Sequence, residues 1–274
     1  MAVLATIIVG EVIALILAAV VGFAVAKATD KFGANRHIRE ILNFNFSEED
    51  NDLLFVFPHR ARREEHEILP PIAVEDALAI NNILTLLRKT GWKGRSRIRN
   101  AAALEDRDKK RNIVTLGGPK ANDFTAEILE QTKKKQEHYK RYKRVFEFVQ
   151  DKQNPDHWQI WRGDSPYPSA DAYNVLGPDE EILDYGLVIK LSNPRDERDD
   201  PKEPRNKVLV LAGVRGIGTW AASDHLRKRI REIHERKAGR HGFRKDGDLA
   251  TAIEGRYKKL DIIDTHCDVF FDIS

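Results

Sequence analysis

The sequence predicts an α/β fold: an N-terminal transmembrane helix followed by a mixed, partly parallel sheet with flanking helices, in a Rossmann-like arrangement. Two observations carry this prediction. The chain begins with a long apolar segment, and two later segments each run from a β-branched strand through a glycine-rich turn into a helix. Such strand–turn–helix units are the halves from which parallel α/β sheets are built.

The apolar segment spans Val3 to Ala26 and carries one ionisable side chain, Glu11. A helix of that length is about 36 Å long, enough to cross a hydrocarbon core of roughly 30 Å. No Lys or Arg precedes the segment, whereas Lys27 and Lys31 follow closely, so the positive-inside rule places the N-terminus outside and the remainder in the cytosol. The alternative is a cleaved signal peptide ending at Ala24-Val25-Ala26, but it would lack a basic n-region and be unusually long.

Glu11 lies within the predicted span, where a carboxylate is costly and usually pairs with another group. We therefore expect Glu11 to contact another membrane helix; a protonated or snorkelling side chain is the alternative. This predicts a single-pass protein of the cell membrane whose partners are the lipid bilayer and other membrane-protein subunits. Three regions follow: an anchor (1–27), a juxtamembrane segment (28–50) and a cytosolic α/β domain (51–274).

The composition says little about chemistry. The chain has 274 residues with 46 Lys and Arg against 43 Asp and Glu, a net charge of +3 that does not by itself indicate a nucleic-acid binder. A single cysteine excludes an intramolecular disulfide. No motif identifies a cofactor, and we predict no metal site and no catalytic residue.

Hydrophobic patterning places the elements of the domain. We expect a short helix that ends near Asn43 and an amphipathic helix at Val74–Lys89. Further helices are expected from about Asp123 and from about Thr219 to Lys237. Strands are expected at Asp52–Phe57, Asn112–Leu116, Val145–Val149, His157–Trp161, Gly186–Leu191, Lys207–Ala212 and within Leu260–Ile273.

The two glycine turns are the candidate ligand site. If their strands are neighbours, both turns open onto the carboxyl edge of the sheet, where backbone N–H groups and helix dipoles attract anions. Arg215 is suited to a phosphate or carboxylate, and Trp220 to stacking. The candidate contacts are Gly117, Gly118, Asn122 and Thr125 in the first turn, and Gly213, Arg215, Gly216, Gly218, Thr219 and Trp220 in the second. The alternative is architectural, with glycines for tight turns, Asn122 and Thr219 as N-caps and Trp220 in the core.

Two similar motifs are rejected on their position in the chain. The run Leu211–Gly218 looks like the fingerprint of short-chain dehydrogenases, but it is one residue short and too close to the C-terminus for the remaining βα units. The run Asp264–Asp268 resembles the first metal motif of amidohydrolase-type dipeptidases, but no barrel can follow it. We expect instead an end strand with a buried Cys267.

Three basic stretches offer contacts with anionic lipid: Lys133–Lys135, Lys140–Arg144 and Arg227–Arg240. Nucleic acid is disfavoured because no aromatic platform accompanies them. The alternative is a solvated helix surface balanced by Glu and Asp.

The pairing of GGPxxNxxT (Gly117–Thr125) with AGxRGxGTW (Ala212–Trp220) is similar to an uncharacterised prokaryotic group of proteins. The first motif alone also resembles a segment of archaeal surface-layer proteins, a role at odds with the cytosolic orientation. The resemblance covers Asp52 to about Lys237 and implies that both units lie in one α/β domain. It implies no activity.

The sequence thus favours a membrane-anchored cytosolic domain that binds or senses a small anionic, nucleotide-like ligand at the two turns. The alternative is a non-catalytic scaffold or accessory subunit of a larger membrane protein complex, because no trio of nucleophile, base and orienting residue is recognisable. An enzyme is the less favoured reading.

Overall fold

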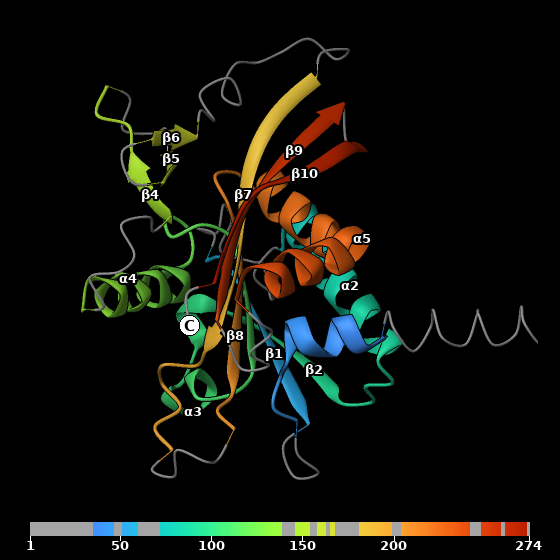
Figure 1. The fold of residues 1–274 in the computed structure, drawn as a ribbon. Helices are drawn as coiled ribbons and strands as arrows, with labels where there is room; N and C mark the ends of the chain where they lie inside the picture. The colour runs from blue at the N-terminus through green and yellow to red at the C-terminus, as the bar shows by residue number, and fades with distance from the viewer. Residues whose placement is uncertain are drawn as a thin grey trace, which may run out of the picture.

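A seven-stranded mixed sheet forms the centre of the protein, as the computed structural model shows (Figure 1). The structure describes residues 35–46, 51–59, 72–138, 146–153, 158–162, 165–167, 181–198, 204–241, 248–258 and 261–272. The predicted membrane span and Glu11 lie outside these ranges. Within them, none of the helices has the length and apolar character needed to cross a membrane.

The sheet has a parallel half and an antiparallel half, in the strand order β10-β9-β7-β8-β3-β1-β2. Its strands are β1 (Asp52–Phe57), β2 (Arg95–Asn100), β3 (Ile113–Leu116), β7 (Glu181–Ser192), β8 (Lys207–Gly213), β9 (Leu249–Lys258) and β10 (Asp261–Asp272). Strands β2, β1, β3 and β8 pair in parallel, and β7, β9 and β10 join them antiparallel. The predicted mixed, partly parallel α/β sheet is confirmed.

Helices cover both faces of this sheet (Figure 1). On one face lie α2 (Val74–Lys89), α5 (Gly216–His241) and a short helix over residues 35–42. On the other face lie α4 (Asp123–His138) and a small antiparallel sheet of β4 (Phe146–Gln150), β5 (Trp158–Arg162) and β6 (Ser165–Tyr167). Two short helices, η1 (Ala101–Ala103) and α3 (Asp106–Lys109), connect β2 to β3.

The central strands are apolar because both of their faces are covered, which is the usual condition of parallel strands. Every residue of β1, β3 and β8 is buried. Side chains of β8 alternate between two cores: Leu209 and Leu211 pack with α2 and α5, whereas Val208 and Val210 pack with α4 and the small sheet. The sheet therefore separates two hydrophobic cores.

The segment before β1 belongs to the first of these cores. Ile38, Ile41 and Leu42 of the 35–42 helix are at most 2% exposed and join the cluster that contains α2 and α5. A polar contact adds to this packing: Glu40 accepts from His234 of α5 at 2.6 Å and from Arg36 at 2.7 Å. The expected juxtamembrane segment is thus partly built into the domain.

Most expected elements occur where the sequence placed them. β1 and α2 have the predicted bounds, and β3 and β8 differ by one residue at one end. Helix α5 begins at Gly216 rather than near Thr219. Three strands had no counterpart among our expectations: β2, β6 and β9.

Substituting Ile41 tests the docking of the short helix. We expect Ile41→Ala to lower the free energy of unfolding by roughly 2–5 kcal/mol, because it removes a side chain that is only 1% exposed and leaves a cavity in its place. Urea unfolding of the full chain in mild detergent measures this. The matched control is Val74→Ala, since Val74 is 69% exposed. Equal effects of the two substitutions would show that the 35–42 helix does not depend on this packing.

Candidate functional site

The two glycine turns lie side by side at the carboxyl edge of the parallel strands. Their strands are neighbours, with Leu116 of β3 opposite Leu211 of β8. The Gly117 N–H donates to the Leu211 carbonyl at 2.9 Å, and a Cβ on Gly118 would come within 2.8 Å of the Gly213 carbonyl oxygen. The strands before the two turns are therefore neighbours, which is the condition on which our site prediction depended.

Side chains of the first turn bind the turn itself. Asn122 is fully buried; its amide nitrogen donates to the Leu116 carbonyl at 2.7 Å and to Thr115 Oγ1 at 3.0 Å, and its Oδ1 accepts from the Thr125 N–H at 3.0 Å. The Thr125 and Thr115 hydroxyls share a hydrogen bond of 2.7 Å. Asn122 is thus the N-cap of α4 and also ties the helix to β3. Gly117 has φ +83°, a conformation that favours glycine.

The second turn is compact. The Gly213 N–H donates to Thr219 Oγ1 at 3.0 Å, and Thr219 is fully buried. The Gly218 backbone lies directly against the Tyr185 carbonyl of β7, where a Cβ would not fit. These positions hold the first turn of α5 against the sheet. Arg215 and Gly216 are half-buried and lie nearer the surface.

Asp184 of β7 is a residue of this site that sequence reasoning missed. Its Oδ2 accepts from the Gly218 N–H at 2.7 Å and its Oδ1 from the Tyr185 N–H at 2.8 Å. The side chain therefore occupies the anion position at the N-terminus of α5. The available signal was an acidic residue in the middle of the apolar run ILDYGLVI, where a charge is costly.

Burial dominates the ionisation of Asp184. Desolvation raises the pKa of this carboxyl from 3.8 to about 7, against the lowering effects of the Tyr185 and Gly218 N–H groups and of Arg215. The carboxyl thus changes charge near neutral pH, next to the turn that carries Arg215.

Trp220 lies near the ring of Tyr257, an aromatic side chain of β9. Its ring centroid is 6.5 Å from that of Tyr257 on β9, with an angle of 38° between the rings. The Tyr257 hydroxyl donates to the Ile217 carbonyl at 2.7 Å, and burial raises the pKa of this hydroxyl. Trp220 is half-buried in this arrangement and takes part in the packing of α5 on the sheet.

A cavity of about 190 Å³ adjoins the first turn on the face of α4. It lies between α4 and the small sheet, with Pro119 at one end and the rings of Phe148 and Trp158 among its walls. Lys133 and Glu147 line it as well and form an ion pair of 3.2 Å. The Phe148 ring also lies 3.5 Å from where a Cβ of Gly118 would stand, so cavity and turn are contiguous.

The described residues contain no group of three His, Cys, Asp or Glu side chains that could hold a metal ion. Cys267 is buried on β10, as expected of an end strand, and shares a 3.0 Å contact with the Thr251 hydroxyl. His266 is exposed on the opposite side of that strand.

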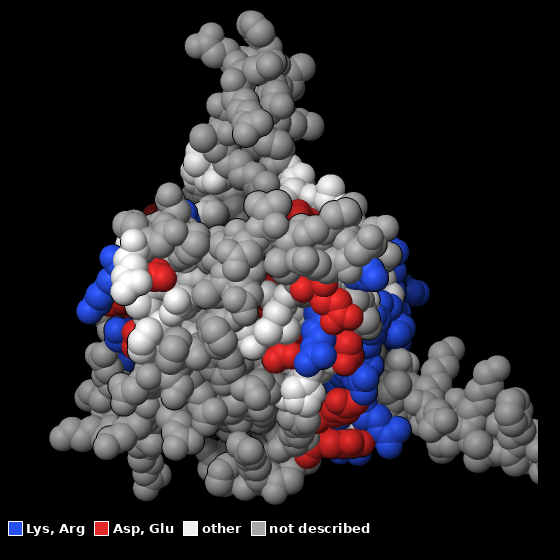
Figure 2. Space-filling model, turned by 90° about the horizontal axis from the view of Figure 1, so that it is seen from above, with Lys and Arg blue, Asp and Glu red and all other residues white. Residues whose placement is uncertain are grey.

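Four cations of α5 (Arg227, Lys228, Arg229 and Arg231) are paired along the helix. Asp224 contacts Arg227 at 2.8 Å and Lys228 at 2.7 Å, Arg229 contacts Glu232 at 2.6 Å and Arg231 contacts Glu235 at 2.8 Å. Figure 2 shows acidic and basic side chains interspersed on the side of the molecule that carries α5. Of the other basic stretches, Lys140–Arg144 lies outside the described residues.

No protein-family model, no curated protein and no solved structure matches this chain.

Replacing Asp184 tests its buried carboxyl. Because the folded-state pKa lies above the unfolded value, the native state retains a proton that the unfolded chain has lost, and stability falls as the pH rises from about 4 to about 7. We expect the stability of wild type relative to Asp184→Asn to decline over this window by several kcal/mol, at about 1.4 kcal/mol per pKa unit, and to level off above it.

Urea unfolding at a series of pH values gives this difference. Asp264→Asn is the matched control, because the exposed Asp264 also accepts from the next residue's N–H, at 2.8 Å. A wild-type-minus-variant difference that stays flat between pH 4 and 7 would rule out the raised pKa of Asp184.

Proposed function

We propose that this chain is a single-pass membrane protein whose α/β domain binds a small anionic, nucleotide-like ligand at the carboxyl edge of β3 and β8. The observation that carries the proposal is the contact between the two glycine turns beside an aromatic cavity. A glycine turn lets a ligand approach the backbone, and a neighbouring aromatic cavity offers a place for a planar ring.

The anion position of this proposal is the first turn, together with Arg215. The N-terminus of α5 already holds the Asp184 carboxyl, so an external anion there would meet a negative charge whenever Asp184 is ionised. The half-buried Gly118 and Pro119 of the first turn border the cavity instead. A phosphate at this turn would face Arg215 from the adjoining turn, and a base would lie toward Phe148 and Trp158.

The proposal includes the membrane anchor. Its support is the apolar run of Val3–Ala26 and the basic residues that follow it, which favour a cytosolic domain. Nucleotide-like metabolites are cytosolic, so this orientation suits the ligand class. Binding rather than catalysis is proposed because the sequence shows no recognisable set of catalytic residues.

Thermal shift of the full chain in mild detergent tests ligand binding. We screen mononucleotides, dinucleotides, cyclic nucleotides and sugar phosphates; a ligand at 100 times its dissociation constant adds about 2.7 kcal/mol of stability. We expect Arg215→Ala to weaken the shift by at least about tenfold in ligand concentration, as for loss of a charge-assisted hydrogen bond. The matched control is Arg205→Ala, an exposed arginine just before β8 at its other end. A shift that survives Arg215→Ala unchanged would contradict the site.

A second candidate function is that of a non-catalytic accessory subunit. It is favoured by the internal bonding of Asn122, Thr125 and Thr219, which gives the turns an architectural role without any ligand. The expected Glu11 contact within the membrane points the same way.

Molar-mass measurement after gentle detergent extraction tests whether the protein is an accessory subunit. An accessory subunit should run as a stable heteromeric assembly that Glu11→Ala weakens, whereas Glu49→Ala, outside the predicted span, leaves it intact. A monodisperse single chain would count against this candidate.

A further inference from the structure

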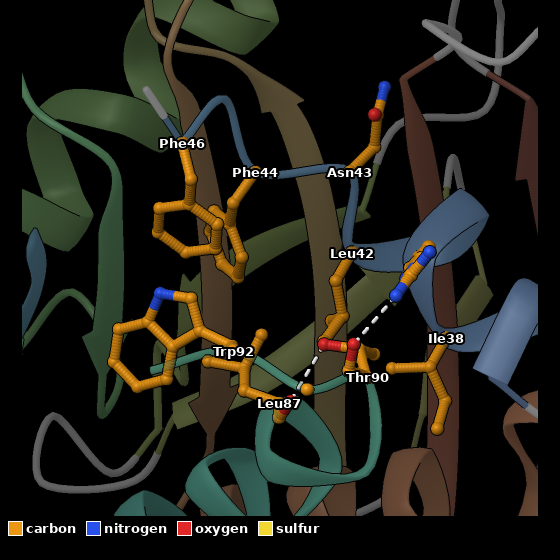
Figure 3. Close-up of a pocket in the computed structure, with 10 residues that line it drawn as sticks. Ile38, Leu42, Asn43, Phe44, Phe46, Leu87, Thr90 and Trp92 are labelled. Carbon is orange, nitrogen blue, oxygen red and sulfur yellow. Dashed lines mark hydrogen bonds between the residues drawn. The ribbon is translucent and has the colours of Figure 1, made fainter. Parts of the chain in front are cut away.

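A second cavity, of about 350 Å³, lies at the opposite edge of the sheet from the glycine turns. It opens between the 35–42 helix, the residues that follow it and the C-terminal end of α2 (Figure 3). Its apolar lining is formed by Ile38, Leu42, Phe44, Phe46, Leu87 and Trp92. The volume is in the range of small-molecule sites, which begins at about 300 Å³.

The polar groups around this cavity are largely satisfied by one another. Arg39 donates to the Thr90 carbonyl at 2.7 Å, and the Thr90 hydroxyl donates to the Leu87 carbonyl at 2.7 Å (Figure 3). The indole N–H of Trp92 donates to Asn51 Oδ1 at 2.8 Å. The interior therefore presents mainly carbon, and such a cavity favours an apolar occupant over water.

Three aromatic rings form one wall. Phe46 stands between Phe44 and Trp92, with ring centroids 5.7 and 5.4 Å away. All three side chains are half-buried. A cluster of large apolar side chains that stays partly accessible to solvent indicates a binding surface.

Exposed cations stand in or next to the lining segments of this cavity. Arg39, Arg88, Lys89 and Lys93 are all exposed and adjoin or belong to the lining. No acidic residue lines the cavity. Within the described part of the chain, these four side chains have no carboxylate partner, in contrast to the paired cations of α5. The charge of the opening is complementary to an anionic headgroup.

The lining of this cavity is close along the chain to the predicted membrane span. Eight residues, 27–34, separate the predicted span from the described helical residues 35–42. A fully extended chain of that length reaches at most about 29 Å. The cavity is then within reach of the inner leaflet, whose surface carries anionic lipids.

We infer that this cavity receives an acyl chain of an anionic membrane lipid, with the headgroup held by Arg39, Arg88, Lys89 and Lys93. The inference rests on the proposed membrane anchor and is independent of the ligand at the glycine turns. Occupation fixes the amino edge of the sheet against the bilayer and leaves the carboxyl edge facing the cytosol.

Fluorescence quenching by brominated acyl chains tests the inference directly. The chain has four tryptophans, so replacing Trp158, Trp161 and Trp220 by Phe leaves Trp92 as the only reporter. The full chain is reconstituted in bilayers that contain either a brominated anionic or a brominated zwitterionic phospholipid. We expect stronger quenching of Trp92 by the anionic lipid at equal mole fraction.

Charge reversal and a polar substitution in the lining identify the site. We expect Arg88→Glu with Lys89→Glu to raise the mole fraction of anionic lipid needed for half-quenching by at least about tenfold, from the usual contribution of basic residues near a charged bilayer. The matched control is Lys152→Glu with Lys258→Glu, two exposed lysines after β4 and at the end of β9. Phe46→Gln should reduce quenching without reversing charge, and its thermal unfolding reports whether the fold is kept.

Three outcomes overturn the inference: equal quenching by the two lipids, quenching that survives the reversal at Arg88 and Lys89, or quenching unaffected by Phe46→Gln. Flotation with the vesicles separates this failure from failure of the anchor, since a chain that does not float contradicts the anchor. A parallel titration with a brominated fatty acid in zwitterionic detergent then still measures the cavity. Quenching there that does not depend on the four cations would show that the cavity takes an apolar chain without recognising an anionic headgroup, and this would also overturn the inference.

Discussion

The close approach of the two glycine turns is the constraint on which the rest of this fold depends. Gly118 lies so near the Gly213 carbonyl that a Cβ would be 2.8 Å from its oxygen. This contact fixes how β3 and β8 end, and hence where α4 and α5 begin. β8 is also the strand at which the sheet changes from parallel to antiparallel pairing. A shift at this point would move both helix starts and the first antiparallel strand together.

The start of α5 shows how a fold can use a feature that elsewhere binds ligands. A helix N-terminus beside a glycine turn attracts anions, and here the protein supplies the anion itself through Asp184. The cost is a buried carboxyl whose pKa rises to about 7, because desolvation outweighs the stabilising N–H groups. The first turn, capped by the neutral Asn122, carries no such charge. The two turns look alike in sequence but differ in electrostatics.

Features that depend on neighbouring residues in the chain could be predicted from the sequence, whereas features that join distant segments could not. β1, α2 and both strand–turn–helix units follow from local patterns, since apolar runs, glycines and capping residues stand next to each other in the chain. Asp184 is 34 residues away from Gly218, and no local rule assigns it to the start of α5. The cavities likewise join residues from distant segments, such as Trp158 with Pro119, and Phe46 with Trp92.

Two strands of the central sheet, β2 and β9, were missed in the sequence for opposite reasons. β2 is an edge strand with five exposed residues and the sequence RSRIRN, so it lacks the apolar alternation that marks a strand. β9 is largely buried, but its alanines and Gly255 give a weak hydrophobic signal. Gly255 lies where a Cβ would come within 2.6 Å of the Ala221 methyl of α5. Small residues are needed there because the helix is close, and that requirement cannot be read from β9 alone.

Helix α2 links the two edges of the sheet at which we place binding. A Cβ on Gly216, in the second glycine turn, would lie 3.3 Å from the carboxyl carbon of Glu75 in the first turn of α2. At the other end of α2, Leu87 and Thr90 line the cavity of about 350 Å³. Its 16 residues span about 24 Å as a helix. Helix α2 could couple binding at one edge to binding at the other only if it had two packing positions against α5. The buried hydrogen bond of 3.0 Å between Asn82 and Ser223 joins these two helices, and a sliding of α2 would have to break it. That bond therefore opposes such a sliding, because breaking it would leave two buried polar groups without each other.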